Sequence, residues 1–484
     1  MRFSVATGRR FAAVALTGVL AGCVMAPASR PAATLLPPAA IDDVASVSGP
    51  GAAFPDDRWW TAYADPGLDG LIDEALVHSP DMAVAAARIR AADAARTRAG
   101  GALLPTVTVS GAVGGNKQSY NLGIPEQFVP KGVIETGNLA ATLGLNIDLW
   151  GRNRAALAAA RGEAAAARVD AAQARLMLAS AIALSWGNLA QLQVSRELAL
   201  QSVTALGGVE RLTGERVRAG IDNRADHELA IARYAGAQQA LAGLDELIAL
   251  ERNRLAALIG AGPDRAARLP LPAIDLQKTT PVPENLAANL LGRRPDIVAA
   301  RLRAEAASAR VKSARRAFYP DINLAGVVGL QSLGLDKLFD TGSSYANFGP
   351  AITLPIFDGA RLASNYRTAE AGHDEAVARY NQTLLNALRE VADVLGSRRA
   401  LAQRLTAAHT AAAAATTAAG LARLRHEQGI ANLLQVLTAE DNALASQRTL
   451  AELEARGFLL DVTLVRALGG GFTATVPDTE QPTR

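Results

Sequence analysis

Hydrophobic positions follow two different periods along this chain. Residues 66–100 and 283–317 show helical spacing, and long proline-free stretches with apolar stripes run over residues 152–217 and 360–428. Short segments in which apolar and polar residues alternate, typical of half-buried strands, precede each long stretch. At 1.5 Å per residue each long stretch predicts a helix of about 100 Å. A coiled coil or a helical tube requires such helices, whereas a compact domain does not.

Four segments show the alternation, and each predicts a strand of about nine to eleven residues, the length that crosses a bilayer at a tilt. Their apolar positions are Val107, Val109 and Val113; Leu139, Ala141, Leu143, Leu145, Ile147 and Leu149; Ile322, Leu324, Val328 and Leu330; and Phe348, Ile352, Leu354 and Ile356. Aromatic residues mark the strand ends, as at membrane interfaces. They are Phe318, Tyr319, Trp150 and Phe357 at one side and Tyr120, Tyr345 and Phe348 towards the other.

Four strands cannot close by themselves in a membrane, because lipid tolerates no unpaired strand edge and membrane barrels begin at about eight strands. If these strands span a bilayer, the chain must therefore oligomerise. Two copies supply about eight strands around a filled interior, and three supply about twelve and leave room for a pore. A soluble sandwich, or a small sheet packed on the helices, is the alternative.

The pattern occurs twice, which indicates a tandem duplication. Ser79-Pro80-Asp81 is answered by Arg294-Pro295-Asp296, and Leu258-Ile259-Gly260 by Ala467-Leu468-Gly469. The segment from Arg218 to Asn223 is answered by the segment from Glu427 to Asn432. In each half the long helix is expected to end at a glycine, Gly220 or Gly429. Asn223 and Asn432 then cap the returning helices, with Asp226 and Gln435 three residues later in a capping-box pattern.

Composition excludes several kinds of chemistry. The 49 Lys and Arg residues nearly balance 46 Asp and Glu residues, so no excess charge points to nucleic acid. One cysteine and five histidines, no two of them at metal-ligand spacing on one helix, argue against zinc and redox sites. No phosphate-binding loop, nucleophile elbow or metalloprotease motif is present, and we expect no enzyme. We expect Arg293-Arg294 beside Asp296 to form a surface ion-pair cluster, and Gly469-Gly470-Gly471 to be a flexible stop.

The N-terminus predicts an exported protein. Basic residues precede a short apolar run from Phe11 to Val19, too short to span a bilayer, so residues 1–22 are predicted to be a signal peptide. Leu20-Ala21-Gly22-Cys23 resembles the lipobox of bacterial lipoproteins, in which the cysteine becomes an acylated first residue; an ordinary cleavage site is the alternative. Val24, where an aspartate often signals inner-membrane retention, points to the outer membrane. Residues 23–55 are expected to be a flexible, acylated tether.

From residue 59 to residue 472 the chain resembles TolC-type outer-membrane efflux proteins, specifically the NodT-like lipoprotein branch that serves tripartite (RND-type) pumps. The more specific matches are Trp59-Trp60, Asp65-Pro66, Leu103-Leu104-Pro105, Arg293-Arg294-Pro295-Asp296-Ile297, and the run from Ala467 to Phe472. The resemblance implies a mainly α-helical homotrimer. A twelve-stranded β-barrel in the outer membrane would stand on a twelve-helix periplasmic tunnel, with repeats at residues 56–270 and 271–472 and a tail at 473–484.

The resemblance also implies where this tunnel works. The periplasmic adaptor is expected to contact the two helical turns, through Arg218, Gly220, Ile221, Asn223, Gln428, Gly429, Ile430 and Asn432. Ile430 and Leu434, one helical turn apart, match the family's apolar constriction; ordinary core packing is the alternative. The family often has an aspartate followed by an arginine three residues on, where this chain has Thr438 and Asp441. The polar latch is therefore expected to be rearranged, with Asp222, Asp226 or Arg224 as substitutes.

The sequence thus predicts a passive outer-membrane exit channel for drugs or toxic small molecules, opened at its periplasmic end when an adaptor and an inner-membrane pump dock. No cofactor is expected besides the lipid on Cys23. Two alternatives stay open: a lipid-anchored coiled-coil scaffold of the envelope, and the same channel used for protein secretion. Neither the cargo nor the energy source of the pump follows from the sequence.

Overall fold

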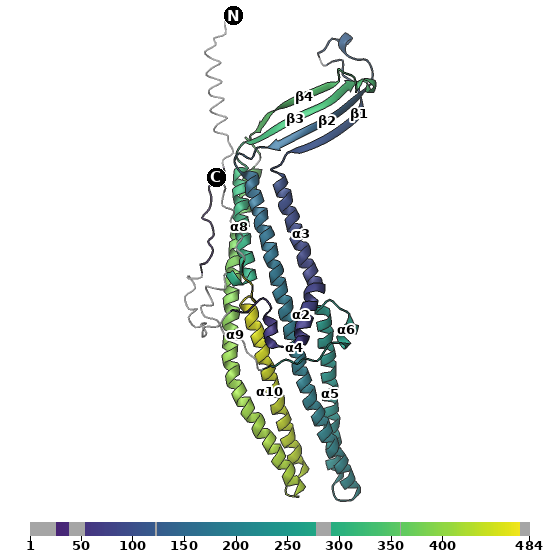
Figure 1. Ribbon diagram of the computed structural model, residues 1–484, viewed down its shortest axis with the longest axis vertical. Helices are drawn as coiled ribbons and strands as arrows, with labels where there is room; N and C mark the ends of the chain where they lie inside the picture. Colours follow the sequence, from purple (N-terminus) through teal and green to yellow (C-terminus); the bar gives the residue numbers. More distant parts are fainter. Residues whose placement is uncertain (1–25, 38–53, 122, 277–291, 359, 475–484) are drawn as a thin grey trace. The chain divides into compact units, whose positions relative to one another are not determined.

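The computed structural model describes residues 26–37, 54–121, 123–276, 292–358 and 360–474, so the predicted signal peptide and Cys23 lie outside the described residues. The elements, labelled in Figure 1, are η3 (Trp59–Tyr63), α2 (Pro66–His78), α3 (Pro80–Gly101), β1 (Thr106–Asn116), η4 (Glu126–Phe128), β2 (Ile134–Asn146), α4 (Arg152–Arg218), α5 (Arg224–Leu258), α6 (Pro263–Ala267), α8 (Pro295–Arg316), β3 (Asp321–Leu333), η5 (Leu335–Lys337), β4 (Ser344–Thr353), α9 (Arg361–Glu427) and α10 (Leu433–Ala467).

The chain divides into two compact units. The first comprises residues 1–35, 89–166 and 300–380, and the second comprises residues 36–88, 167–299 and 381–484. The sheet belongs to the first unit and the two helical turns belong to the second.

In the first unit the four strands form one antiparallel sheet in the order β1-β2-β3-β4. The register places Val107 opposite Leu143, and Phe348 opposite Gly326. Residues that face each other across the ladder lie on the same side of the sheet. One side therefore carries valine, leucine, isoleucine and phenylalanine, and the other carries mostly threonine, serine, asparagine, alanine and glycine. The predicted alternation is confirmed.

The apolar side of the sheet is exposed among the described residues. Val107, Val109 and Val113 are 68–70 % exposed, and Phe348 and Ile352 are as open. The outer strands β1 and β4 each pair along one edge only in the described sheet. Both the apolar side and the two edges therefore lack partners within the described chain, and each is costly to leave in water.

Two strand ends differ from the prediction. β2 ends at Asn146, so Ile147 and Leu149 lie beyond it, and β4 ends at Thr353, before Leu354 and Ile356. Asp148 accepts hydrogen bonds from the backbone amides of Asn153 and Arg154 and so begins α4. The chain has to turn between β2 and α4 so that Asp148 can reach these amides. The strand therefore ends before the alternating pattern does.

The long helices are confirmed. α4 and α9 have 67 residues each, and α5 and α10 have 35 each. The equal lengths follow from the duplication.

The stretch predicted as one helix over residues 66–100 is divided. α2 ends at His78, the following Ser79 is extended with a ψ of 133°, and α3 begins at Pro80. Proline disfavours helical geometry in the residue before it, which explains the break. Arg294 and Pro295 repeat the pattern at the start of α8. The part of the predicted helix over residues 283–291 lies outside the described residues.

The core of the second unit forms where η3 and α2 pack on the longer helices. The predicted stripe on α4 is confirmed, because Leu178, Ile182, Trp186 and Leu189 are at most 4 % exposed. Asp65 is buried with them and accepts hydrogen bonds from Gly67, Leu68 and Ala273 amides and from the Trp186 indole. A carboxylate with four donors is well satisfied, and it fixes the start of α2 on α4.

Two further expectations need correction. Arg294 is 6 % exposed, not a surface residue, and it donates to Asp296, to Glu390 and to the Ala467 carbonyl. Gly469, Gly470 and Gly471 all have positive φ and are tightly enclosed rather than flexible. A side chain on Gly469 would meet the Arg293 carbonyl oxygen at 1.9 Å. The glycines are required because the α10 C-terminus packs directly on another backbone.

Part of the predicted tether is described, and it is held. In residues 26–37 the Ala33 amide donates to Asp374 at 3.4 Å, and the Leu36 amide donates to Asn381 at 2.9 Å. Ala26 packs against Phe318, Leu362 and Tyr366. These residues are therefore bound at several points to α9, and they do not behave as a free linker.

Candidate functional site

The two helical turns are built on the same backbone motif. Gly220 and Gly429 have φ of 74° and 73°, the left-handed conformation that glycine adopts most easily. The Ile221 amide donates to the Arg216 carbonyl at 2.9 Å, and the Ile430 amide donates to the Arg425 carbonyl at 2.8 Å. This six-to-one bond satisfies a carbonyl left open at the end of a helix. The predicted end of each long helix is confirmed.

The returning helices begin as predicted. The Asn223 side chain accepts a hydrogen bond from the Asp226 amide at 2.9 Å, and Asn432 accepts one from the Gln435 amide at 3.0 Å. The Asn223 amide group also donates to the Asp226 carboxylate at 2.7 Å. Both caps fix the direction in which α5 and α10 leave the turn.

The side chains of the turns differ. Asp222 accepts two hydrogen bonds from Arg216, at 2.7 and 3.0 Å. These bonds hold the pKa of the Asp222 carboxyl below its ordinary value of 3.8 despite the opposing effect of desolvation. In the second turn Ala431 takes the equivalent place, and its carbonyl lies 2.9 Å from Nδ1 of His426. The first turn is therefore tied by an ion pair that the second lacks.

One ion pair joins the two hairpins. Arg233 on α5 binds Asp441 on α10. Close by, Arg423 on α9 binds Glu440 on α10 at 2.6 Å. Thr438 instead donates to the Leu434 carbonyl of its own helix. Sequence analysis identified Asp441 as a departure but missed Arg233, because nothing in the local spacing of a single sequence reveals a partner 208 positions away.

The residues expected at the adaptor contact and the gate are all found at or beside the turns. Arg218, Gly220, Ile221, Asn223, Gln428, Gly429 and Asn432 are exposed. Ile221, Ile430 and Leu434 are 64, 63 and 54 % exposed. Ile430 lies in the connection before α10, and Leu434 lies in the first turn of that helix. Asp226 and Arg224 stay within the first hairpin: Asp226 contacts Asn223 and Arg224 contacts Glu228.

In the first unit, aromatic residues lie just after β2 and β4 and just before β3. Trp150 stacks on Tyr319 with ring centroids 5.1 Å apart, and its indole donates to the Pro320 carbonyl. Phe357 is 90 % exposed. Phe318 differs from the expectation, because it is 9 % exposed and packs edge-on against Tyr366. Phe348, expected near a strand end, lies in the middle of β4.

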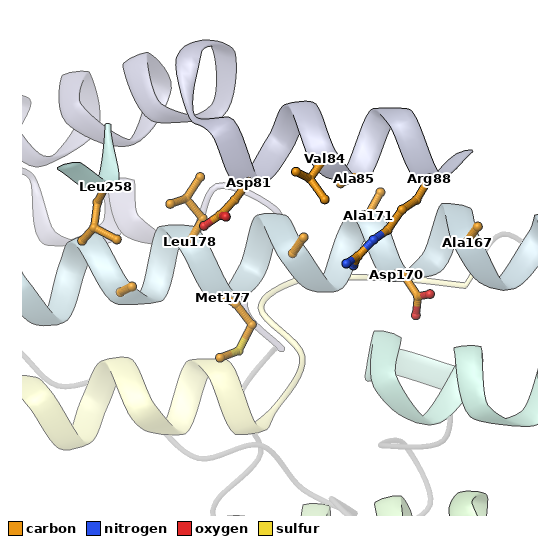
Figure 2. A pocket seen from close by; sticks show the side chains of 12 residues that line it. Asp81, Val84, Ala85, Arg88, Ala167, Asp170, Ala171, Met177, Leu178 and Leu258 are labelled. Carbon is orange, nitrogen blue, oxygen red and sulfur yellow. The ribbon is translucent and has the colours of Figure 1, made fainter. Parts of the chain in front are cut away.

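The described residues also form a groove. Figure 2 shows a groove of about 380 Å³ between α3 and α4, lined mainly by small and apolar side chains, into which Arg88 extends from α3. Among the described residues no three His, Cys, Asp or Glu side chains are grouped as a metal site. None of the helices in the described part of the chain contains a stretch long and apolar enough to cross a membrane.

Comparisons with known proteins agree with this arrangement. The crystal structure of the outer membrane protein VceC from Vibrio cholerae superposes with a TM-score of 0.80 at 39 % identity, over 87 % of this chain and all of VceC. The multidrug resistance outer membrane protein MdtP of Shigella flexneri is 28 % identical over 95 % of both chains. The fusaric acid resistance protein FusA of Burkholderia cepacia is 30 % identical over 75 % of this chain and 69 % of FusA.

The sequence profile of the outer membrane efflux protein family matches residues 71–261 and 286–470, which together make up most of the chain and correspond to its two repeats. The chain therefore belongs to the outer membrane efflux protein family and has the TolC-type fold of an outer-membrane channel.

Proposed function

We propose that three copies of this chain form a passive exit channel of the outer membrane, through which a tripartite pump expels toxic small molecules. The observation that carries the proposal is the four-stranded sheet, with one bare apolar side, one polar side and two unpaired edges. In lipid every edge must be paired, so the sheet has to close with further copies. Three copies supply twelve strands, enough to enclose water.

Drugs and related toxic compounds are the proposed cargo. MdtP carries multidrug resistance in its name and FusA carries fusaric acid resistance. A water-filled tube needs few specific contacts, so it accepts varied molecules. The channel is proposed to be passive, with an inner-membrane pump supplying the energy.

The periplasmic adaptor is proposed to dock on the two turns. Ile221 and Ile430 occupy the position after the glycine, where an apolar residue usually packs back onto its own helix. Here both isoleucines are more than 60 % exposed. Burial against an adaptor removes this apolar surface from water and stabilises the docked state.

The gate is proposed to be held closed by Arg233 and Asp441 together with the apolar residues Ile430 and Leu434. The ion pair connects the two hairpins, so it resists their separation. Both side chains are about 40 % exposed, and such a pair contributes about 0–1 kcal/mol. A weak latch suits a gate that docking has to open. Asp222, Asp226 and Thr438 support the turns from within.

A lipid on Cys23 is proposed to anchor the N-terminus in the outer membrane. Several acyl chains on one residue give stable anchoring. Replacing Cys23 by serine should remove the lipid, detected by mass spectrometry, while the trimer stays membrane-integral. Release of the variant from the membrane on mild extraction would favour the tethered scaffold and contradict the channel.

Recording in planar bilayers tests the channel. The purified trimer should show low conductance, and Arg233→Ala should open it more often. Arg224→Ala is the matched control, since Arg224 pairs with Glu228 of its own helix and does not connect the two hairpins. A trimer that never conducts, even with Ile430 and Leu434 replaced by serine, would overturn the proposal.

Mild crosslinking in cells identifies the partners: an adaptor and a pump support the proposal, and a secreted protein caught in the tube points to protein secretion.

A further inference from the structure

A basic cavity lies between the helices of the first unit. It has a volume of about 560 Å³ and is formed by α3, α4, α8 and α9. Each of these helices contributes one arginine, namely Arg98, Arg152, Arg310 and Arg361. Glu163 is the one acidic residue in the lining. The cavity therefore has an excess of three positive charges (four arginines against one glutamate).

Local partners neutralise two of the four arginines. Glu163 binds Arg310 at 2.8 Å. Asp358 lies 3.9 Å from Arg361 and accepts the Leu362 amide at 2.8 Å. Arg98 and Arg152 form no ion pair with any residue in the described ranges. Two guanidinium groups are therefore left to solvent or to a ligand.

The placement of these arginines is also unfavourable for the helices. Arg152 and Arg361 are the first residues of α4 and α9, and neither helix has an acidic residue in its first turn. The N-terminus of a helix carries partial positive charge, so an arginine there is repelled, whereas an acidic residue would be stabilised. The arginines that line the cavity carry like charges and repel one another. Asp148 and Asp358 already place a carboxylate at these two helix starts. An anion in the cavity would therefore chiefly offset the mutual repulsion of the arginines that line it.

The rest of the lining is apolar. Leu362 and eight alanines make up most of it, seven of them from α3, α4 and α8 and one just after α8: Ala92, Ala95, Ala99, Ala156, Ala159, Ala160, Ala314 and Ala317. Small side chains leave the volume empty, and their methyl groups give it a surface that favours hydrocarbon over water. Basic groups next to an apolar surface are the arrangement that binds acidic lipid head groups between helices.

We infer that this cavity binds an anionic amphiphile, with its acidic head between Arg98 and Arg152 and its apolar body on the alanines. The inference rests on the proposed function, because two sources of this chemistry meet such a channel: an organic acid in transit and an acidic phospholipid of the surrounding membrane. The same guanidinium groups bind a carboxylate or a phosphate.

Binding is measured on the purified full-length protein in neutral detergent. Isothermal titration compares 2-naphthoate with 2-naphthylmethylammonium, which has the same ring and the opposite charge. Native mass spectrometry compares phosphatidylglycerol with phosphatidylcholine. At least one anion should bind clearly better than its counterpart, which is cationic for naphthoate and zwitterionic for phosphatidylglycerol. Binding of naphthoate alone assigns the site to cargo, and binding of phosphatidylglycerol alone assigns it to membrane lipid. Equal binding within both pairs would overturn the inference.

Variants locate the site. Arg98→Gln with Arg152→Gln should weaken binding of the preferred anion about tenfold. Arg96→Gln is the matched control, since Arg96 is on the same helix but pairs with Asp93 outside the cavity and should have no effect. Ala95→Leu, which fills the cavity and keeps its charge, should weaken binding as well. Unchanged affinity in both the charge and the filling variants contradicts the site. None of these measurements requires conduction, so a failed channel and a failed site are distinguishable.

Discussion

The turn after α4 and the turn after α9 have the same backbone and different side chains. Glycine φ values agree within 1° and the six-to-one bonds within 0.1 Å. Yet Asp222 binds Arg216 in the first turn, and alanine replaces the aspartate in the second. Backbone hydrogen bonds have to be satisfied in both copies, whereas exposed side chains are free to change after duplication. The two turns therefore share one backbone motif, and their side chains have diverged.

A second pair of equivalent positions lies where each returning helix ends. Gly260 and Gly469 both have positive φ. Gly260 faces the carbonyl oxygen of His78, just before the break at Pro80, and Gly469 faces that of Arg293, just before Pro295. At the break itself one half has Ser79, which bonds the Asp81 amide at 3.3 Å, and the other has buried Arg294. Again the backbone is kept while the side chain differs. The comparison can be tested at each of these sites.

The largest effect is expected at the break. Arg294→Ala should lower the free energy of unfolding by about 3–5 kcal/mol, because Asp296 and Glu390 would lose a buried partner. Ser79→Ala should cost only about 1 kcal/mol, the typical value of a lost cap. Burial lowers the pKa of the Arg294 guanidinium, but hydrogen bonds from it to Asp296 outweigh this, so Arg294 stays charged. Thermal unfolding of the two variants measures the difference; similar losses would contradict the asymmetry.

The next effect concerns the glycines that end the returning helices. Alanine at either position takes a left-handed conformation that costs about 1–2 kcal/mol. Gly469→Ala should cost more than Gly260→Ala, because its Cβ would meet a carbonyl oxygen at 1.9 Å rather than 2.7 Å. The melting temperature of each variant, measured as the temperature at which the trimer dissociates in detergent, gives the order of the two effects. Gly349→Ala, at a glycine with open space around it, is the control.

A smaller effect should follow from exchanging the side chains of the turns. Asp222→Ala should speed hydrogen exchange at the amides of residues 219–222, and Ala431→Asp should slow it in the second turn by offering a partner to Arg425. The lowered pKa of Asp222 means that its ion pair stabilises the folded state above pH 3.8 and is lost as the pH falls through the lower folded value. Protection that already disappears near pH 6 would show that another group governs the first turn.

The smallest effect should be shared by both turns. Asn223→Ala and Asn432→Ala should each destabilise the protein by about 1 kcal/mol, since each removes one cap of the same geometry. Equal shifts in melting temperature would confirm that the caps are equivalent. A markedly larger shift for Asn223 would instead indicate that its second bond, to the Asp226 carboxylate, carries weight.

The regular parts of the fold were predictable because each has a local cause. Absence of proline over residues 152–217 predicted α4, the alternation from Val107 to Val113 predicted β1, and Gly220 with Asn223 predicted a turn. The sharp strand ends were not predictable, because the cap from Asp148 competes with the continuing apolar pattern. The break before Pro80 was missed although proline itself signals it.

The candidate site was predictable at its tips but not in its connections. The exposed residues of both turns follow from the duplicated glycines. Arg233, Arg294 and the enclosed glycines at 469–471 act through contacts with segments distant in sequence, which spacing alone does not reveal. The basic cavity was missed for the same reason, since its four arginines come from four separate helices.

The edge of β1, all eleven of whose residues are exposed, has a consequence for the life of each newly exported copy. Until further copies pair with it, this edge is available to any extended peptide in the periplasm. Aggregation through strand addition then competes with assembly of the oligomer. Rapid encounter between fresh subunits, or an escort that shields this rim, is therefore part of what the molecule needs in order to mature.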